Sequence, residues 1–215
     1  SILTYKLFEK LWIDLKEMTL MLKEAPFNVS RDSMSQHVED YLLHNLERFN
    51  EIAEKRPVYD EIAKRKGRAK YEGAFVFQPT PALYEDVGAF DFTSMYGSII
   101  NSFNLSRASF LGSKISEKEK KEANEVEMEF EGEKKFYFSK EKSFFPILLG
   151  ELIERRKVLK KELREKPDEV LKARSNASKL LVNASYGYLG FFGARYYCPE
   201  AAAGTAAIAR KFAKE

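Results

Sequence analysis

Residues 146–188 read PILLGELIERRKVLKKELREKPDEVLKARSNASKLLVNASYGY, and this stretch decides how the chain folds. Apolar residues recur at helical spacing from Pro146 to Arg164 and again from Asp168 to Tyr188. Pro167 stands between the two runs, where a proline ends one helix and the aspartate after it begins the next. We therefore predict an antiparallel helical hairpin.

The predicted hairpin carries an excess of positive charge. Residues 142–179 hold eleven Lys or Arg and six Asp or Glu, a net +5 (11 minus 6), while the rest of the chain is −2 (3 minus 5). Arg156 and Lys160 share one face of the first helix, being four residues apart. Lys179, Asn183 and Tyr186 share one face of the second. Two such faces turned toward a common groove would suit a triphosphate with a base beside it.

The same residues have a simpler explanation. Lys and Arg on helices usually face solvent, and a charge run is weak evidence of a site. Asn183 and Tyr186 are also ordinary residues near a helix end, and Gly187 would then be the C-cap. Spacing alone leaves both explanations open.

Helices and a β-hairpin are predicted outside this stretch. Residues 4–23 have the spacing of an amphipathic helix, and Ser33 with Gln36 resembles a capping box that opens a second helix through about Phe49. Residues 55–70 are predicted as a charged surface connection and residues 114–125 as a solvated loop. Residues 126–138 alternate around Glu131-Gly132 and predict a hairpin; residues 191–199 predict extended structure, and a last helix follows from Glu200. The predicted class is α+β.

Asp91 is the second candidate for chemistry. AFVFQP (74–79) and DVGAFDF (86–92) are predicted as short strands, and residues 94–103 as a helix. Asp91 falls at the end of an apolar strand and just before a helix. A carboxylate at a strand end, beside the backbone N–H groups of a helix start, is an arrangement that holds a magnesium-bound phosphate. A helix N-cap is an equally good reading of this aspartate.

Composition excludes several classes of protein. The single Cys198 rules out an intrachain disulfide, and no cysteine cluster suggests zinc. Only His37 and His44 are present, so imidazole chemistry is not expected. The longest apolar run, Ala201 to Ala209, is too short for a bilayer, so we expect no membrane association and a cytoplasmic protein. The net charge of +3 makes no global case for nucleic acid.

Four stretches in order resemble the motifs of family B DNA polymerases, of the archaeal type. DFTSMYGSII (91–100) resembles motif A, D-x-x-S-L-Y-P-S-I-I, and KLLVNASYG (179–187) resembles motif B, K-x-x-x-N-S-x-Y-G. YEGAFVFQP (71–79) is similar to the Y-x-G-G-x-V template element, and FFPILLGELIERRKVLKK (144–161) to the first fingers helix. The resemblance runs from about Phe27 to the C-terminus. The departures from these patterns are Ala74, Met95, Gly97, Asn176 and Ala184.

The resemblance implies template-directed deoxynucleotidyl transfer with two Mg²⁺ ions. Asp91 would be the catalytic carboxylate that bridges both ions, and the Phe92 carbonyl would complete one of them. The incoming dNTP would be held by the backbone of Ser94, Met95 and Tyr96 and by Arg156, Lys160, Lys179, Asn183 and Tyr186. The ring of Tyr96 would exclude a ribose 2′-hydroxyl. The primer–template DNA would be contacted by Tyr71, Gly73 and Gly187.

The resemblance also implies a division of the chain. Residues 1–70 would be a helical lead-in, 71–141 part of the palm, 142–190 the fingers, and 191–215 a return to the palm. The family's motif C, Y-x-D-T-D, is expected after the last helix, so a second polypeptide or a further C-terminal region would supply its carboxylate and the thumb. The protein would be associated with the nucleoid. The alternative is a catalytically degenerate polymerase-like subunit that binds primer–template DNA or partner chains.

Overall fold

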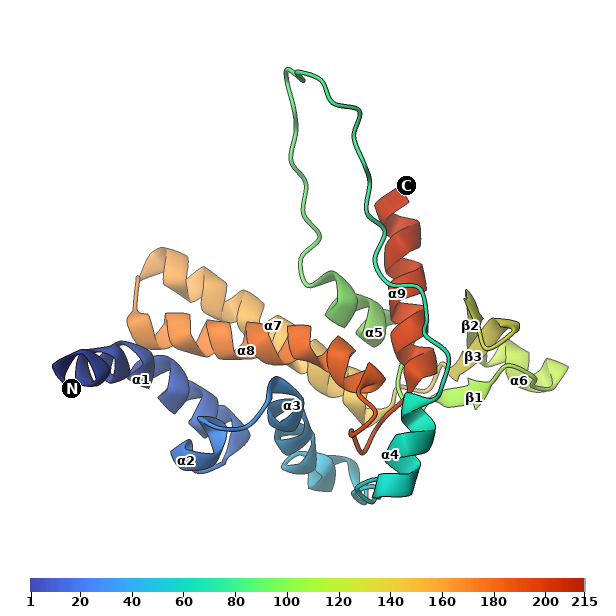
Figure 1. Ribbon diagram of the computed structural model, residues 1–215, viewed down its shortest axis with the longest axis horizontal. Coiled ribbons are helices and arrows are strands. Elements are labelled where there is room, and N and C mark those ends of the chain that lie inside the picture. Colours follow the sequence, from blue (N-terminus) through green and yellow to red (C-terminus); the bar gives the residue numbers. More distant parts are fainter. Residues whose placement is uncertain (215) are drawn as a thin grey trace.

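Two long antiparallel helices form the longest part of the molecule. The structure is a computed structural model that describes residues 1–214. In it α7 (Phe144–Glu165) and α8 (Glu169–Gly190) lie side by side (Figure 1). Asp168 caps α8, because its carboxylate accepts a hydrogen bond from the Leu171 backbone N–H at 2.8 Å. The predicted helical hairpin is confirmed.

The end of α8 differs from the prediction. Gly187 is not the C-cap, since the helix continues through Gly190 and Phe191 caps it. Tyr188 and Leu189 are buried in the last turn, with 1% and 0% of their surfaces exposed. Burial of these two side chains stabilises helical backbone beyond a glycine that would otherwise end it.

Two N-terminal helices pack on α8. They are α1 (Ile2–Leu22), confirming the first predicted helix, and α3 (Met34–Leu43); α2 (Pro26–Val29) lies between them. Ser33 caps α3 by accepting from the Gln36 N–H, but the Gln36 side chain bonds Asp40, so the predicted box is half formed. The predicted second helix also ends early. A separate 3₁₀ turn, η1 (Leu46–Phe49), follows it and turns Leu46 into the core.

The charged connection predicted over residues 55–70 contains a short helix, α4 (Tyr59–Lys66). None of its residues is fully buried. Arg65 docks it by donating hydrogen bonds to the backbone carbonyls of Phe192 and Ala194, at 3.2 and 2.7 Å. Residues 191–198, predicted as extended, form turns at this contact.

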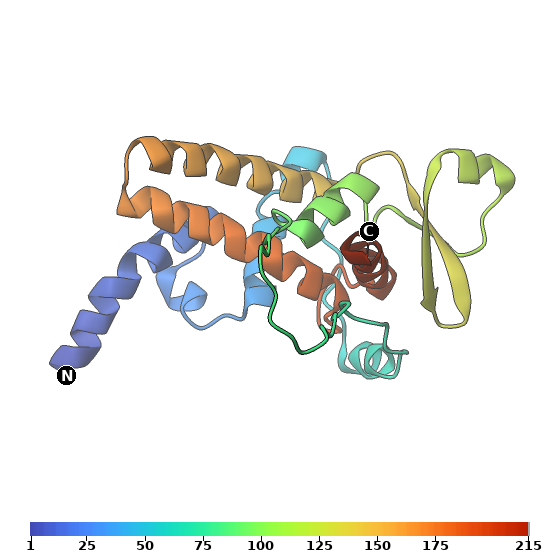
Figure 2. The same cartoon turned by 90° about the horizontal axis from the view of Figure 1, so that it is seen from above.

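A small antiparallel sheet lies at one end of the helical hairpin (Figure 2). Its order is β1 (Phe110–Gly112), β3 (Glu133–Ser139), β2 (Ala123–Phe130). The predicted β2–β3 hairpin is confirmed; Glu131 and Gly132 form its turn with positive φ angles of 49° and 82°. The loop predicted over residues 114–125 instead contains the helix α6 (Glu117–Lys121) and the start of β2. A capping box between Ser116 and Glu119 begins α6.

Two further helices join the sheet to the hairpin. They are α5 (Met95–Phe103), which packs on α7 and α8, and α9 (Pro199–Lys214), which packs on α5, α8 and β2. Both confirm predicted helices. Gly204 lets α9 approach the sheet, since a Cβ there would lie 3.2 Å from Cγ1 of Val126. The class is α+β, as predicted. No helix within residues 1–214 combines the length and the apolar composition that crossing a bilayer requires.

Residues 67–94 form a long exposed connection between α4 and α5, which Figure 1 shows beside α9. The two strands predicted here are wrong. A strand needs a partner for its N–H and C=O groups, and this connection pairs with none within the described chain. Its apolar side chains are exposed, including Val76 (77%), Val87 (74%) and Phe90 (99%).

Candidate functional site

The start of α5 brings the predicted motif A residues to the helical hairpin. Ser94 caps α5 in the left-handed conformation, with φ 52° and ψ 46°, and its side chain makes no capping bond. Non-glycine residues adopt this region rarely, and the surrounding packing must hold them there. Met95 and Tyr96 are half-buried in the first turn, where the backbone N–H groups of a helix lack intrahelical partners.

Tyr96 and Tyr186 form a stacked pair between α5 and α8. Their ring centroids are 4.5 Å apart and their planes are 24° from parallel. Both side chains are half-buried, so one side of the pair remains accessible to solvent. Two residues that lie ninety positions apart in the sequence therefore make one aromatic surface.

Gly97 permits this close approach of α5 to the hairpin. A Cβ at Gly97 would lie 2.4 Å from Cγ1 of Val182 on α8 and 3.4 Å from Cδ1 of Ile153 on α7. The first distance is shorter than any real carbon–carbon contact. The departure from the motif A proline is thus matched by a bulky neighbour on α8.

Arg156 reaches the same place from α7. Its guanidinium Nη1 lies 3.4 Å from the Ser94 hydroxyl oxygen, a long hydrogen bond. Its Nε is buried and has no hydrogen-bond partner within the described residues. A buried guanidinium nitrogen that is left unpaired is costly, so this arginine has unused capacity to bind an anion.

The other predicted hairpin residues lie on the surface. Lys160, Lys179, Asn183 and Gly187 are all exposed on α7 and α8. Within residues 1–214, no hydrogen bond or ion pair joins the three side chains to one another or to Arg156. The structure therefore brings Ser94, Arg156, Tyr96 and Tyr186 together, and leaves these cations free in solvent.

Asp91 and Phe92 lie at the end of the exposed connection, just before α5. Both are exposed, and Phe92 shows 59% of its surface. Among the described residues, no three His, Cys, Asp or Glu side chains are close enough to hold a metal ion. The carboxylate of Asp91 and the carbonyl of Phe92 are hard oxygen donors, the kind that Mg²⁺ prefers, but they fill only part of an octahedral shell.

Tyr71 and Gly73 lie at the other end of the connection, and Tyr71 meets the aromatic pair. Burial first, and the neighbouring Tyr71 side chain second, raise the pKa of Tyr186 well above its usual range. Tyr71 also packs edge-on against Phe130 of β2, with ring centroids 6.4 Å apart. The predicted template element thus adjoins the predicted nucleotide residues.

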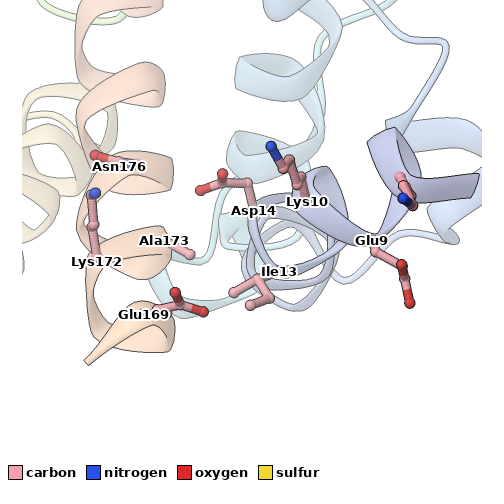
Figure 3. Close-up of a pocket in the computed structure, with 9 residues that line it drawn as sticks. Glu9, Lys10, Ile13, Asp14, Glu169, Lys172, Ala173 and Asn176 are labelled. Atoms are coloured by element: carbon pink, nitrogen blue, oxygen red, sulfur yellow. The ribbon is translucent and has the colours of Figure 1, made fainter. Parts of the chain in front are cut away.

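A separate hollow lies between α1 and α8, and none of the predicted site residues lines it (Figure 3). Its volume is about 500 Å³. Its charged lining is mixed, because Lys6, Lys10 and Lys172 line it together with Glu9, Asp14 and Glu169. Balanced charge of this kind gives no preference for a phosphate or a cation.

Three contacts near the candidate site were not predicted from the sequence. They involve Val182 against Gly97, Gly190 against Tyr71, and Arg210 against the backbone of residues 72–73. An arginine in the last helix gave no signal, because its partners are backbone carbonyls. A second glycine three residues after Gly187 was the one hint of close approach on α8.

The arrangement places the exposed Asp91, a stacked tyrosine pair and an arginine whose Nε has no partner among the described residues around the start of one helix. Residues 27–214 match the family model described as DNA polymerase family B. The chain belongs to this family, as its motifs indicated.

Relatives of this chain include archaeal DNA polymerases. The chain is 33% identical to the DNA polymerase of Thermococcus sp. (strain 9oN-7) over 97% of its own length, and to DNA polymerase 1 of Pyrococcus abyssi over the same share. It superposes on the family B DNA polymerase of the hyperthermophilic archaeon Pyrobaculum calidifontis with a TM-score of 0.74, at 31% identity over 97% of this chain. It spans 26% of the length of each of these three proteins.

Proposed function

We propose that this chain is part of a DNA-directed DNA polymerase and binds the incoming deoxynucleotide for template-directed transfer to a primer. The observation that carries the proposal is the contact of Tyr96 with Tyr186, which joins the motif A helix to the motif B helix. Family membership supports the reaction class, and the contact supports a shared site. On this proposal residues 142–190 act as fingers, and residues 71–141 and 191–215 belong to the palm, after a lead-in over residues 1–70.

The cations of the hairpin would bind the triphosphate. Arg156 has a buried, unpaired Nε, and Lys160 and Lys179 are exposed and available. Their charges would compensate the phosphates when the hairpin moves toward α5, and Asn183 would donate a hydrogen bond nearby. The backbone N–H groups from Ser94 to Tyr96 would take the distal phosphates.

Tyr96 would select deoxyribose over ribose in the incoming nucleotide. Its ring packs against Tyr186 and is held on one side, so it cannot swing away without losing the stack. A deoxyribose would lie on this ring, and a ribose 2′-hydroxyl would collide with it. Tyr186 would lie at the nascent base pair, and Tyr71, Gly73 and Gly187 along the primer–template DNA.

The oxygen atoms of Asp91 and Phe92 are donors of the kind that Mg²⁺ prefers, but two residues supply fewer donors than its octahedral shell requires. When bound, two such ions would polarise the reacting phosphate and lower the pKa of the primer hydroxyl. Asp91 would bind both ions, with the Phe92 carbonyl on one. The remaining ligands would be phosphate oxygens, water and a second carboxylate from residues outside these 215 or from a partner chain. Such a protein would work at the nucleoid.

A second candidate function is a degenerate subunit that binds primer–template DNA without catalysis. Gly97 in place of the motif proline and the small number of acidic ligands near Asp91 favour it. The two functions differ in their dependence on Asp91.

Primer extension distinguishes them. The chain is assayed with Mg²⁺, alone and mixed with a polypeptide that carries motif C and the thumb. We expect no extension by the chain alone, and extension by the mixture that Asp91→Ala abolishes. The matched control is Glu85→Ala, an exposed carboxylate on the same connection. Extension by the mixture that survives Asp91→Ala refutes the proposed role of Asp91, and DNA binding without any extension favours the degenerate subunit.

A further inference from the structure

Arg210 of α9 holds the backbone of the Tyr71–Gly73 segment. One guanidinium nitrogen, Nη1, donates hydrogen bonds to the carbonyl oxygens of Glu72 and Gly73, the second at 2.7 Å. The other, Nη2, lies 3.2 Å from a carboxylate oxygen of Glu72. The planar guanidinium of Arg210 therefore contacts three acceptor oxygens on two successive residues, Glu72 and Gly73.

The carbonyl contacts matter more than the ion pair. The Arg210 side chain is 13% exposed, whereas that of Glu72 is 76% exposed, so solvent screens the pair of charges. Hydrogen bonds from a largely buried guanidinium to carbonyls are charge-assisted, and a lysine could not reproduce their fork geometry. The backbone of this segment is thus fixed from α9.

Gly190 seats the same segment on α8. A Cβ at Gly190 would lie 2.9 Å from the Tyr71 hydroxyl oxygen and 3.6 Å from Cβ of Ala202 on α9. An alanine here would have to displace the Tyr71 side chain. The glycine therefore gives the tyrosine the room to lie against the helix that carries Tyr186.

The contacts of Tyr71 extend from Gly190 to the proposed nucleotide site. Tyr71 touches Gly190 and lies beside Tyr186, and Tyr186 stacks on Tyr96 of α5. Arg210 holds the backbone next to this row of three tyrosines. The exposed connection that follows Gly73 also contacts α9, because Nζ of Lys214 lies 5.0 Å from the ring centroid of Phe75.

We propose that Arg210 is a positioning residue: with Gly190 as the seat, it fixes Tyr71–Gly73 so that the template backbone and the Tyr96–Tyr186 pair keep one relative placement. Arg210 acts through the backbone it holds and does not itself contact DNA. This inference rests on the proposed function.

The first experiment needs no DNA. Trypsin cleaves after Lys70, an exposed residue directly before the held segment. Because local opening limits such cleavage, Arg210→Lys should speed cut formation at Lys70–Tyr71 several-fold while the unfolding temperature stays near wild type. Lys211→Ala is the matched control: this exposed neighbour on α9 should leave the rate unchanged.

The second experiment measures affinity for a fluorescent primer–template duplex over a range of salt. Arg210→Lys and Arg210→Ala should both weaken binding by about tenfold to a hundredfold, the range of a lost charge-assisted hydrogen bond. The slope of log Kd against log salt should stay at the wild-type value, whereas loss of a phosphate contact lowers it by about 0.9. Gly190→Ala should weaken binding as well, and adding Tyr71→Phe, which removes the colliding hydroxyl, should recover part of the loss.

The outcomes separate the two proposals. If the wild-type chain binds the duplex and Arg210→Lys matches it in both affinity and cleavage, the positioning role is refuted and the proposed function stands. If Arg210→Lys keeps full affinity while Arg210→Ala lowers the salt slope, Arg210 is itself a phosphate contact and the positioning role is again refuted. If the wild-type chain binds no primer–template DNA, the proposed function fails together with this inference.

Discussion

The ring of Tyr96 stacks on the ring of Tyr186, with centroids 4.5 Å apart, and joins the first turn of α5 to the last turns of α8. One residue comes from the motif A stretch and the other from motif B. Because each ring limits the movement of the other, a nucleotide bound between α5 and the hairpin would meet a surface that is already ordered. Pre-ordering of this kind lowers the entropy cost of binding.

Replacing Tyr96 by alanine should change sugar choice in the polymerase assembly. We expect ribonucleotides to be incorporated far more readily, because the ring that a 2′-hydroxyl would strike is gone. The stack itself should cost about 0.5–1.5 kcal/mol of stability when lost, which chemical denaturation of the chain would measure. Tyr96→Phe is the control and should retain both the stack and the selectivity. Unchanged selectivity in Tyr96→Ala would show that another residue is the gate.

Gly97→Pro should destabilise the chain although proline suits the first turn of a helix. The ring carbon would collide with Val182, whose Cγ1 is 2.4 Å from the position of a Cβ. Overpacking of this kind costs about 1–3 kcal/mol in the free energy of unfolding. The double variant with Val182→Ala should recover most of that loss, since the colliding methyl groups are removed. A double variant no more stable than Gly97→Pro would contradict the packing explanation.

Glu39 is expected to be a strong determinant of stability. Its carboxylate is buried and accepts hydrogen bonds from the Tyr188 hydroxyl at 3.0 Å and from Arg195, through the backbone N–H at 3.1 Å and Nε at 3.2 Å. Glu39→Ala leaves these donors without an acceptor, so we expect a loss of about 2–4 kcal/mol in thermal or chemical unfolding. Glu47→Ala, on an exposed residue nearby, should change stability little. Equal effects of the two substitutions would exclude the network.

Much of the helical framework could be predicted from the sequence, because apolar spacing and caps are local. Pro167 and Asp168 end one helix and begin the next, as expected, and the turn at Glu131-Gly132 closes the hairpin. The family motifs also identified the residues now found around α5. Their individual roles in binding and catalysis remain predictions.

The rest depends on contacts that a local pattern does not contain. Residues 74–79 and 86–92 have strand composition, but pairing requires a partner strand, and the described chain provides none there. The three residues of β1 are too few to show a period. The clamp of Arg210 on residues 72–73 joins side chain to backbone across 137 positions, so no side-chain pattern predicts it.

Alkaline pH should unfold the chain progressively. Burial raises the pKa of Tyr188 above its ordinary value of 10.0, and the charge of Glu39 adds to the effect. The unfolded chain therefore releases this proton first, so the contribution of Tyr188 to stability is full below pH 10 and falls as pH rises from 10 toward the folded pKa. Each such group contributes a slope of about 1.4 kcal/mol per pH unit in that window. Burial likewise raises the pKa of Tyr186, Tyr196 and Tyr197, which add to the fall.

Denaturant unfolding between pH 9 and pH 11.5 would test this. Tyr188→Phe should be less stable at neutral pH, since Glu39 loses a donor, but its stability should fall less steeply above pH 10 by about one group's slope. Tyr59→Phe, on a side chain that is 84% exposed, is the matched control and should keep the wild-type slope. Parallel curves for Tyr188→Phe and wild type would mean that the buried Tyr188 phenol does not drive the alkaline transition.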